Sequence, residues 1–179
     1  MDFYLQRLQS AIASATEGLD ARSLLVHREG KWSVAEILEH LYLTYTGTIK
    51  GFERCLESGK PLARIPTTQD RIRTLVVVGI GHMPEGRRAP KNAMPRGIPP
   101  EQVLAEVAAK ISEMDAIIQR AEETFGVRTR VLDHPILGPL RAQQWRKFHW
   151  LHGRHHVRQI RRLRNLATFS ASPVTDRSH

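Results

Sequence analysis

The chain has 179 residues, of which 41% are hydrophobic and 25% charged, proportions typical of one globular domain and not of a disordered chain. Its best apolar run, Leu75 to Ile80, is far shorter than the ~18 residues of a membrane span. The N-terminus lacks a signal-peptide pattern, and the single cysteine, Cys55, excludes an internal disulfide and a Cys-rich zinc module. We therefore expect a cytoplasmic protein with no membrane association.

The net charge of +9 comes entirely from the C-terminal third of the chain. Residues 1–125 contain 16 Lys and Arg against 16 Asp and Glu, whereas residues 126–179 contain 11 against 2. Between Arg141 and Arg164 there are eight basic residues and no acidic one. Such a basic segment either binds an anionic partner or is simply a solvated helix face. The second outcome is the commoner one, so we do not expect nucleic-acid binding.

The first half of the chain predicts two helices. Apolar residues recur at helical spacing over residues 2–16, and a loop follows between Gly18 and Gly30. Ser33 and Glu36 form a capping-box pattern, which predicts that a helix begins there and runs to about Leu56. Gly59 and Pro61 then end it.

The rest of the chain predicts three more helices, over residues 69–82, from Pro100 to about Thr124, and from Arg141 to Thr168. The proline-rich segment from Pro84 to Pro100 cannot be regular helix, and no stretch shows the alternation of a β-strand. The sequence thus predicts an all-α fold: a four-helix bundle with one additional short helix and a Pro-rich loop. We expect a single domain over residues 1–169 and a frayed tail over residues 170–179.

Four of the nine histidines lie within eight residues, in the last predicted helix. His152 and His156 are four residues apart, which places them one above the other on the apolar stripe of that helix. The stripe consists of Trp145, Phe148, His152, His156, Ile160 and Leu163. Two such imidazoles, with a third from a facing helix, can hold a divalent metal and leave coordination positions open.

Two other readings stay open for these histidines: hydrogen-bonded core residues, or part of a basic face that touches phosphate. An unsatisfied buried imidazole costs about 1–3 kcal/mol, and a metal would satisfy several at once. His40 lies at the border of the apolar face of the helix that begins near Ser33. Nothing local links His40 to a position 112 residues later.

Two segments, KWSVAEILEHL at residues 31–41 and HWLHGRHHVRQI at residues 149–160, resemble the signature regions of the DinB/YfiT-like superfamily of four-helix bundles. The stretch HPILGPL at residues 134–140 resembles a subgroup of these proteins. The chain departs from the pattern at Val157–Arg158, where many members have Arg-Gly. The resemblance implies a metal triad, one histidine from the second helix and an HxxxH pair from the last, which falls on His40, His152 and His156.

The resemblance also implies a function. Characterised members include thiol-dependent S-transferases and isomerases, and others are described as hydrolases. We therefore expect an enzyme that uses a divalent metal ion (zinc, nickel, manganese, iron or copper) to activate a thiol or a water. Its expected partners are a small-molecule substrate, a low-molecular-weight thiol and a second copy of the chain as a homodimer. No general base is identifiable from the sequence.

Two alternative functions remain at this stage. A non-catalytic metal-binding or stress-related bundle would have a closed, structural triad, and a basic interaction protein would use the Arg141–Arg164 segment on an acidic partner. The other conspicuous residues have mainly structural explanations. We expect His149 and His155 to be surface or structural residues, with a contact behind the metal ligands as the alternative. Capping explains Glu36, with orientation of an imidazole as the alternative, and Gln159 either lines the site or faces a neighbouring helix. A solvated face or a dimer contact is expected for Arg154, Arg158, Arg161 and Arg162, with steering of an anionic substrate as the alternative. Packing is expected for Trp32, Trp145 and Trp150, and burial for Cys55.

Overall fold

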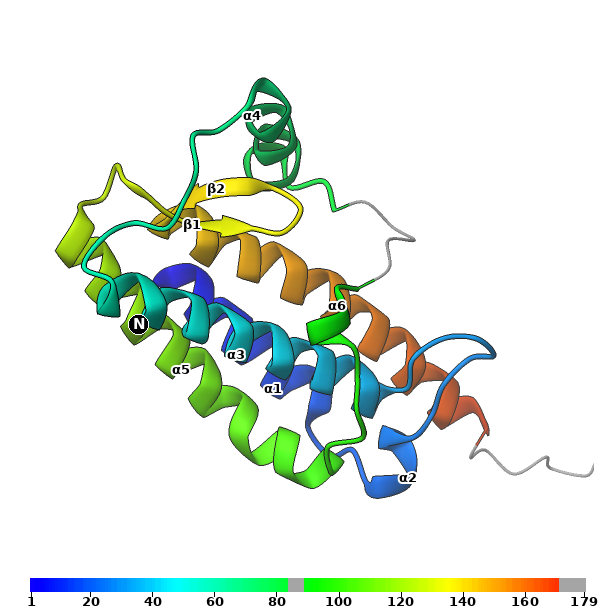
Figure 1. Ribbon diagram of the computed structural model, residues 1–179. Coiled ribbons are helices and arrows are strands. Elements are labelled where there is room, and N and C mark those ends of the chain that lie inside the picture. Colours follow the sequence, from blue (N-terminus) through cyan, green and yellow to red (C-terminus); the bar gives the residue numbers. More distant parts are fainter. Residues whose placement is uncertain (84–88, 171–179) are drawn as a thin grey trace, which may run out of the picture.

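The protein is mostly helical, so the predicted all-α fold is confirmed only as a mostly-α class. The computed structural model describes residues 1–83 and 89–170. In Figure 1 the four longest helices lie alongside one another, with smaller elements near both ends and one short helix, over residues 91–93, along their side. The long helices are α1 (Phe3–Thr16), α3 (Val34–Glu57), α5 (Pro100–Phe125) and α6 (Ala142–Ser170). The smaller elements are α2 (Ala21–Leu24), α4 (Thr68–Thr74), the π-helix η1 (Leu75–Ile80), the 3₁₀-helix η2 (Lys91–Ala93), β1 (Arg130–His134) and β2 (Gly138–Arg141).

The long helices begin and end where their local sequence signals predict. The Asp2 side chain accepts a hydrogen bond from the Tyr4 N–H and caps α1. The predicted capping box opens α3, because the Ser33 N–H donates to Glu36 Oε2 at 2.7 Å and the Glu36 N–H donates to Ser33 Oγ at 3.2 Å. Capping thus accounts for Glu36. Helix α6 begins one residue later than predicted and reaches Ser170, within the usual uncertainty of helix ends.

The prediction that the chain contains no strand is wrong. Strands β1 and β2 form an antiparallel hairpin in which Arg130 pairs with Arg141 and His134 with Gly138. The strands have only five and four residues, and their buried positions do not alternate. A period of two therefore never develops in the sequence, and local patterning does not predict the hairpin.

The predicted helix over residues 69–82 is two different helices. The α-helix α4 ends at Thr74, and the chain continues as the π-helix η1 to Ile80. Val77 and Val78 are buried, but Leu75 and Ile80 are exposed, so this apolar run enters the core only in part. The four-residue helix α2, capped by Asp20, was not predicted because it is too short for helical periodicity to appear.

The Pro-rich segment is not regular α-helix in its described part, as predicted; it contains only the three residues of η2. Residues 84–88 and the predicted tail beyond Ser170 lie outside the described residues. Among the helices that the structure describes, none has the length and apolar character to cross a membrane.

The core lies between the apolar stripes of the four long helices. Helices α1 and α6 approach closely at Gly153, where a Cβ would overlap Leu8 Cδ1. The hairpin closes one end of this core with Val131, Leu137 and Leu140, all fully buried. The face between α3 and α6 is covered by η2 and by the hairpin end (Figure 1), and the candidate site lies there.

Candidate metal centre

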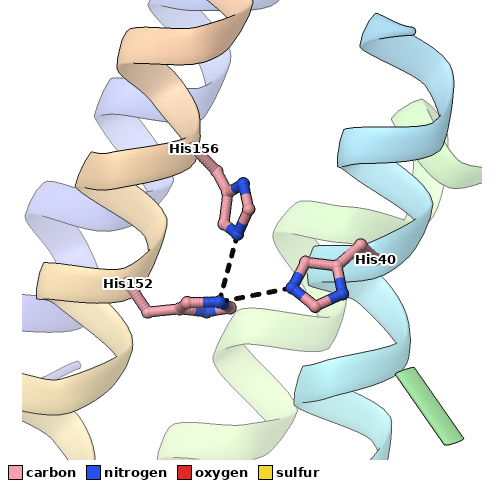
Figure 2. A group of neighbouring side chains, drawn as sticks. All are labelled: His40, His152 and His156. Atoms are coloured by element: carbon pink, nitrogen blue, oxygen red, sulfur yellow. Dashed lines mark hydrogen bonds between the residues drawn. The ribbon is translucent and has the colours of Figure 1, made fainter. Parts of the chain in front are cut away.

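The three predicted histidines converge across the α3–α6 face (Figure 2). His152 Nε2 lies 3.2 Å from His40 Nε2 and 3.1 Å from His156 Nε2. The candidate ligand atoms of all three residues lie within 4.8 Å of one another, close enough to hold a metal ion. His40 and His156 are buried, and His152 is partly buried.

The helices position these rings directly. His152 and His156 are one turn apart on α6, so their rings project from the same face of that helix. His40 comes from the second turn of α3, whose start is fixed by the capping box. Aromatic rings support the cluster, because Trp32 lies 5.0 Å from the His40 ring and Phe148 stacks on His152 at 5.5 Å.

Two outer hydrogen bonds fix the proton on two of the imidazoles. His40 Nδ1 donates to the Ala93 carbonyl at 2.8 Å, and His156 Nδ1 donates to Gln159 Oε1 at 2.8 Å. Both oxygens can only accept, so each Nδ1 carries a proton. In the neutral rings, Nε2 of His40 and of His156 therefore presents a lone pair.

The cluster is consequently short of protons. His152 Nε2 faces both lone pairs and has at most one proton to donate, so at least one of the two short N···N contacts has no hydrogen between its atoms. His152 Nδ1 has no hydrogen-bond partner among the described residues, so no protein contact fixes the tautomer of this ring. A cation that accepts three lone pairs removes the conflict.

Burial keeps the three rings neutral, which is the form that binds a metal. Desolvation lowers the pKa of His156 to about 3, and it lowers the pKa of His40 and His152 as well. Two imidazole nitrogens that share a metal ion at ~2.0–2.1 Å lie ~3.3 Å apart in a tetrahedral site. The observed separations of 3.1 and 3.2 Å are close to that value, and all three ligand atoms lie within 4.8 Å of one another, so two of the three nitrogen pairs already have the spacing of a metal site.

The cluster opens onto a cavity of about 1450 Å³. His40, His152 and His156 all line it, together with apolar side chains such as Ile37 and Phe148. A structural metal site would be enclosed by protein ligands, whereas a catalytic one keeps a position accessible to substrate. Here the three histidines line a cavity.

The Pro-rich segment belongs to the site. Residues 89–94 line the cavity, and the Ala93 carbonyl orients His40. The buried Glu39 carboxylate, 2% exposed, accepts from the Arg96 N–H at 2.6 Å and the Gly97 N–H at 3.1 Å and so ties this segment to α3. Sequence reasoning missed Ala93 and Glu39, because a backbone carbonyl and an interior carboxylate leave no pattern at such separations.

The other histidines of α6 have different places. His149 is fully buried and contacts Thr48 Oγ1 through Nε2 at 3.1 Å, a structural place and not a surface one. His155 lines the cavity, and Gln159 links it to His156 because Gln159 Nε2 lies 3.1 Å from His155 Nε2. Gln159 thus lines the site, which was one of its two predicted places.

The remaining residues lie where their structural explanations predict. Cys55 is fully buried, and Trp145 and Trp150 are buried in the core. Trp32 packs on His40 and also lines the cavity. Arg158 and Arg162 are exposed, as expected of a solvated face, and they also line the cavity.

Fold and site together define a mostly helical protein with three clustered histidines at the wall of a large cavity. The chain belongs to the family described as a protein of unknown function (DUF1569), whose model matches residues 1–163. Neither a curated protein nor a solved structure matches the chain.

Proposed function

We propose that this protein is a DinB-like four-helix bundle that binds one divalent metal ion through His40, His152 and His156 and acts as an enzyme on a small molecule. The observation that carries the proposal is the meeting of three imidazole Nε2 atoms with too few protons between them, beside a cavity. A divalent ion held by three neutral imidazoles acts as a Lewis acid and lowers the pKa of a bound water or thiol. The reaction is therefore of the thiol-transfer or hydrolytic type.

The protein's own part is to hold the ligands rigid and leave one side accessible. Ala93 orients His40, and Gln159 orients His156, because each accepts a hydrogen bond from the Nδ1–H of that histidine. Phe148 supports His152 by stacking on its ring. Such outer contacts raise the basicity of a ligand and fix its direction. The apolar wall of the cavity excludes water from around a bound substrate, which strengthens every charge interaction there.

The test is the metal content of tag-free protein by elemental analysis, before and after reconstitution with zinc, nickel or manganese. We expect about one divalent ion per chain, lost in His40→Ala, His152→Ala and His156→Ala while the helical circular-dichroism signal persists. His27→Ala removes an exposed histidine outside the cluster and is the matched control. A wild-type chain that takes up no metal under any of these conditions contradicts the proposal.

A graded variant separates ligation from general damage. Gln159→Leu removes the acceptor of the His156 Nδ1 proton and should weaken metal affinity by about 10–100-fold without abolishing binding. The metal-loaded protein should also hydrolyse an activated ester or transfer a thiol to an electrophile, and His152→Ala should not. Metal uptake without either activity would contradict the enzyme proposal and indicate a metal-binding protein.

A further inference from the structure

The cavity beside the histidine cluster is strongly cationic. Seven Lys and Arg residues line it, against one carboxylate among the described lining residues, that of Asp133. Asp133 is already paired, because its Oδ2 lies 3.5 Å from Arg64 Nε. Nothing on the cavity wall in the described part of the chain therefore balances the positive charge.

The charges gather from two sides of the cluster. On α6, residues 155, 158, 159 and 162 all line the cavity, a spacing that puts them on one helix face with Arg158 directly below Arg162. Across the cavity, Arg28 and Lys31 precede α3 and Lys91 lies on η2. Neither Arg158 nor Arg162 forms an ion pair within the described residues.

A metal ion would add to this excess, because three neutral imidazoles contribute no negative charge. A low-dielectric cavity lined by one sign of charge concentrates ligands of the opposite sign. Guanidinium groups bind carboxylate and phosphate oxygens through paired N–H donors. The apolar side chains of Trp32, Ile37 and Phe148 on the same wall suit a carbon skeleton.

We propose that the substrate is a small organic anion, with an apolar or aromatic body in the cavity and a carboxylate or phosphate group bound by Arg158 and Arg162. This assignment rests on the proposed function, since it names the substrate class of the same site. It also gives part of the basic segment of α6 a function, because Arg158 and Arg162, although exposed, line the cavity and can bind the anion.

The experiment is calorimetric titration of the full chain with benzoate, with phenyl phosphate and with the neutral isostere benzamide. The chain is titrated both after chelation and after zinc loading, so that anion binding is measured without and with the metal. We expect both anions to bind at least tenfold more tightly than benzamide, and the anion affinity alone to fall as salt is raised. The anion that binds more tightly identifies the group, carboxylate or phosphate, that the site prefers.

The variants test the two arginines against a matched neighbour. Arg158→Gln combined with Arg162→Gln should weaken anion binding by about tenfold or more and change benzamide binding by less than about twofold. Arg161→Gln removes the same charge from an exposed residue of α6 that does not line the cavity and should leave all three affinities unchanged. Circular dichroism confirms that each variant is folded.

Equal binding of benzamide and the anions, no binding of either anion, or an equal loss in Arg161→Gln would overturn the assignment. The last result would mean that the whole basic surface attracts anions, as it would for a polyanionic partner. Failure of the proposed function is distinguishable, because metal uptake is measured separately. If the chain binds anions selectively but takes up no metal, the proposed anion site is supported and the proposed metalloenzyme function is contradicted.

Discussion

His134 shows how one side chain can determine the pH response of a turn. Its Nδ1 accepts hydrogen bonds from the Ile136 N–H at 3.2 Å and the Leu137 N–H at 3.1 Å, which closes the hairpin between β1 and β2. Both partners can only donate, so Nδ1 must be unprotonated. Burial lowers the pKa of His134 to about 4, consistent with a ring that stays neutral in the folded protein.

His134 should therefore make the folded state acid-sensitive. Its pKa is about 6.5 in the unfolded chain and about 4 in the folded one, so below pH ~6.5 only the unfolded state takes up the proton. Stability from this group is complete above pH ~6.5 and is lost as the pH falls towards 4, by up to ~1.4 kcal/mol per pH unit.

Urea unfolding of wild type and His134→Asn between pH 7.5 and 4 measures the effect. Asparagine can still accept from the turn N–H groups but does not titrate, so the variant should lose stability less steeply with acid. His27→Asn changes an exposed histidine and should keep the wild-type slope. Parallel curves for wild type and His134→Asn would show that His134 is not protonated on unfolding.

The candidate site was predictable from the sequence only as far as local spacing reaches. His152 and His156 follow from their separation of one helical turn, which is a local property. His40 required the family resemblance, because the contact between α3 and α6 is set by the whole fold. His134 stands out in the sequence only as the first residue of the HPILGPL stretch, because its double hydrogen bond exists only once the hairpin forms.

At the scale of elements, the packing of α1 on α6 depends on Gly153. A Cβ at this position would overlap Leu8 Cδ1 and lie 3.5 Å from the buried Tyr45 hydroxyl. Glycine is a poor helix former, so its presence inside α6 costs about 1 kcal/mol relative to alanine. The close approach of the two helices offsets that cost.

Gly153→Ala should consequently destabilise the protein although alanine favours helix. Overpacking a core contact costs about 1–3 kcal/mol, which exceeds the gain in propensity. Gly47→Ala on α3 is the matched control, because the nearest atom to its Cβ would be Asn92 Nδ2 at 3.9 Å. Urea unfolding should show a net loss of about 1 kcal/mol or more for Gly153→Ala and a gain of up to about 1 kcal/mol for Gly47→Ala. Equal effects of the two substitutions would contradict this account of the contact.

The elements that the sequence predicted well are those with strong local signals. Helix α3 has a capping box and α5 begins at a proline, and both lie close to their predicted bounds. The hairpin and the π form of η1 do not follow from the sequence. Their residues lack a clear period, and contacts with the rest of the chain decide their conformation. The apolar run from Leu75 to Ile80 predicts a helix but not its π form.

At the scale of the whole molecule, the histidine cluster joins two helices that the core already holds. His40 belongs to α3 and His152 to α6, and both helices bury continuous apolar stripes that extend well beyond the site. A zinc finger, by contrast, has too small a core to fold without its metal. The metal-free protein should therefore remain folded.

Metal binding should nevertheless stabilise the fold by mass action. A ligand that binds only the native state adds about 2.7 kcal/mol at a free concentration about 100 times its Kd. Chelation should lower the free energy of unfolding by about this amount and leave the circular-dichroism spectrum at 25 °C unchanged. In His152→Ala, with one ligand of the cluster removed, added zinc should give no comparable stabilisation.

Thermal unfolding with and without chelator, for wild type and His152→Ala, distinguishes the two kinds of metal centre. Loss of the helical spectrum on chelation would identify a structural metal, because the fold would then depend on the link between α3 and α6. Retention of the spectrum with a lowered melting temperature is the result expected of a preformed site, in which the hydrogen bonds that His40 and His156 donate to Ala93 and Gln159 keep both rings in place before the ion binds.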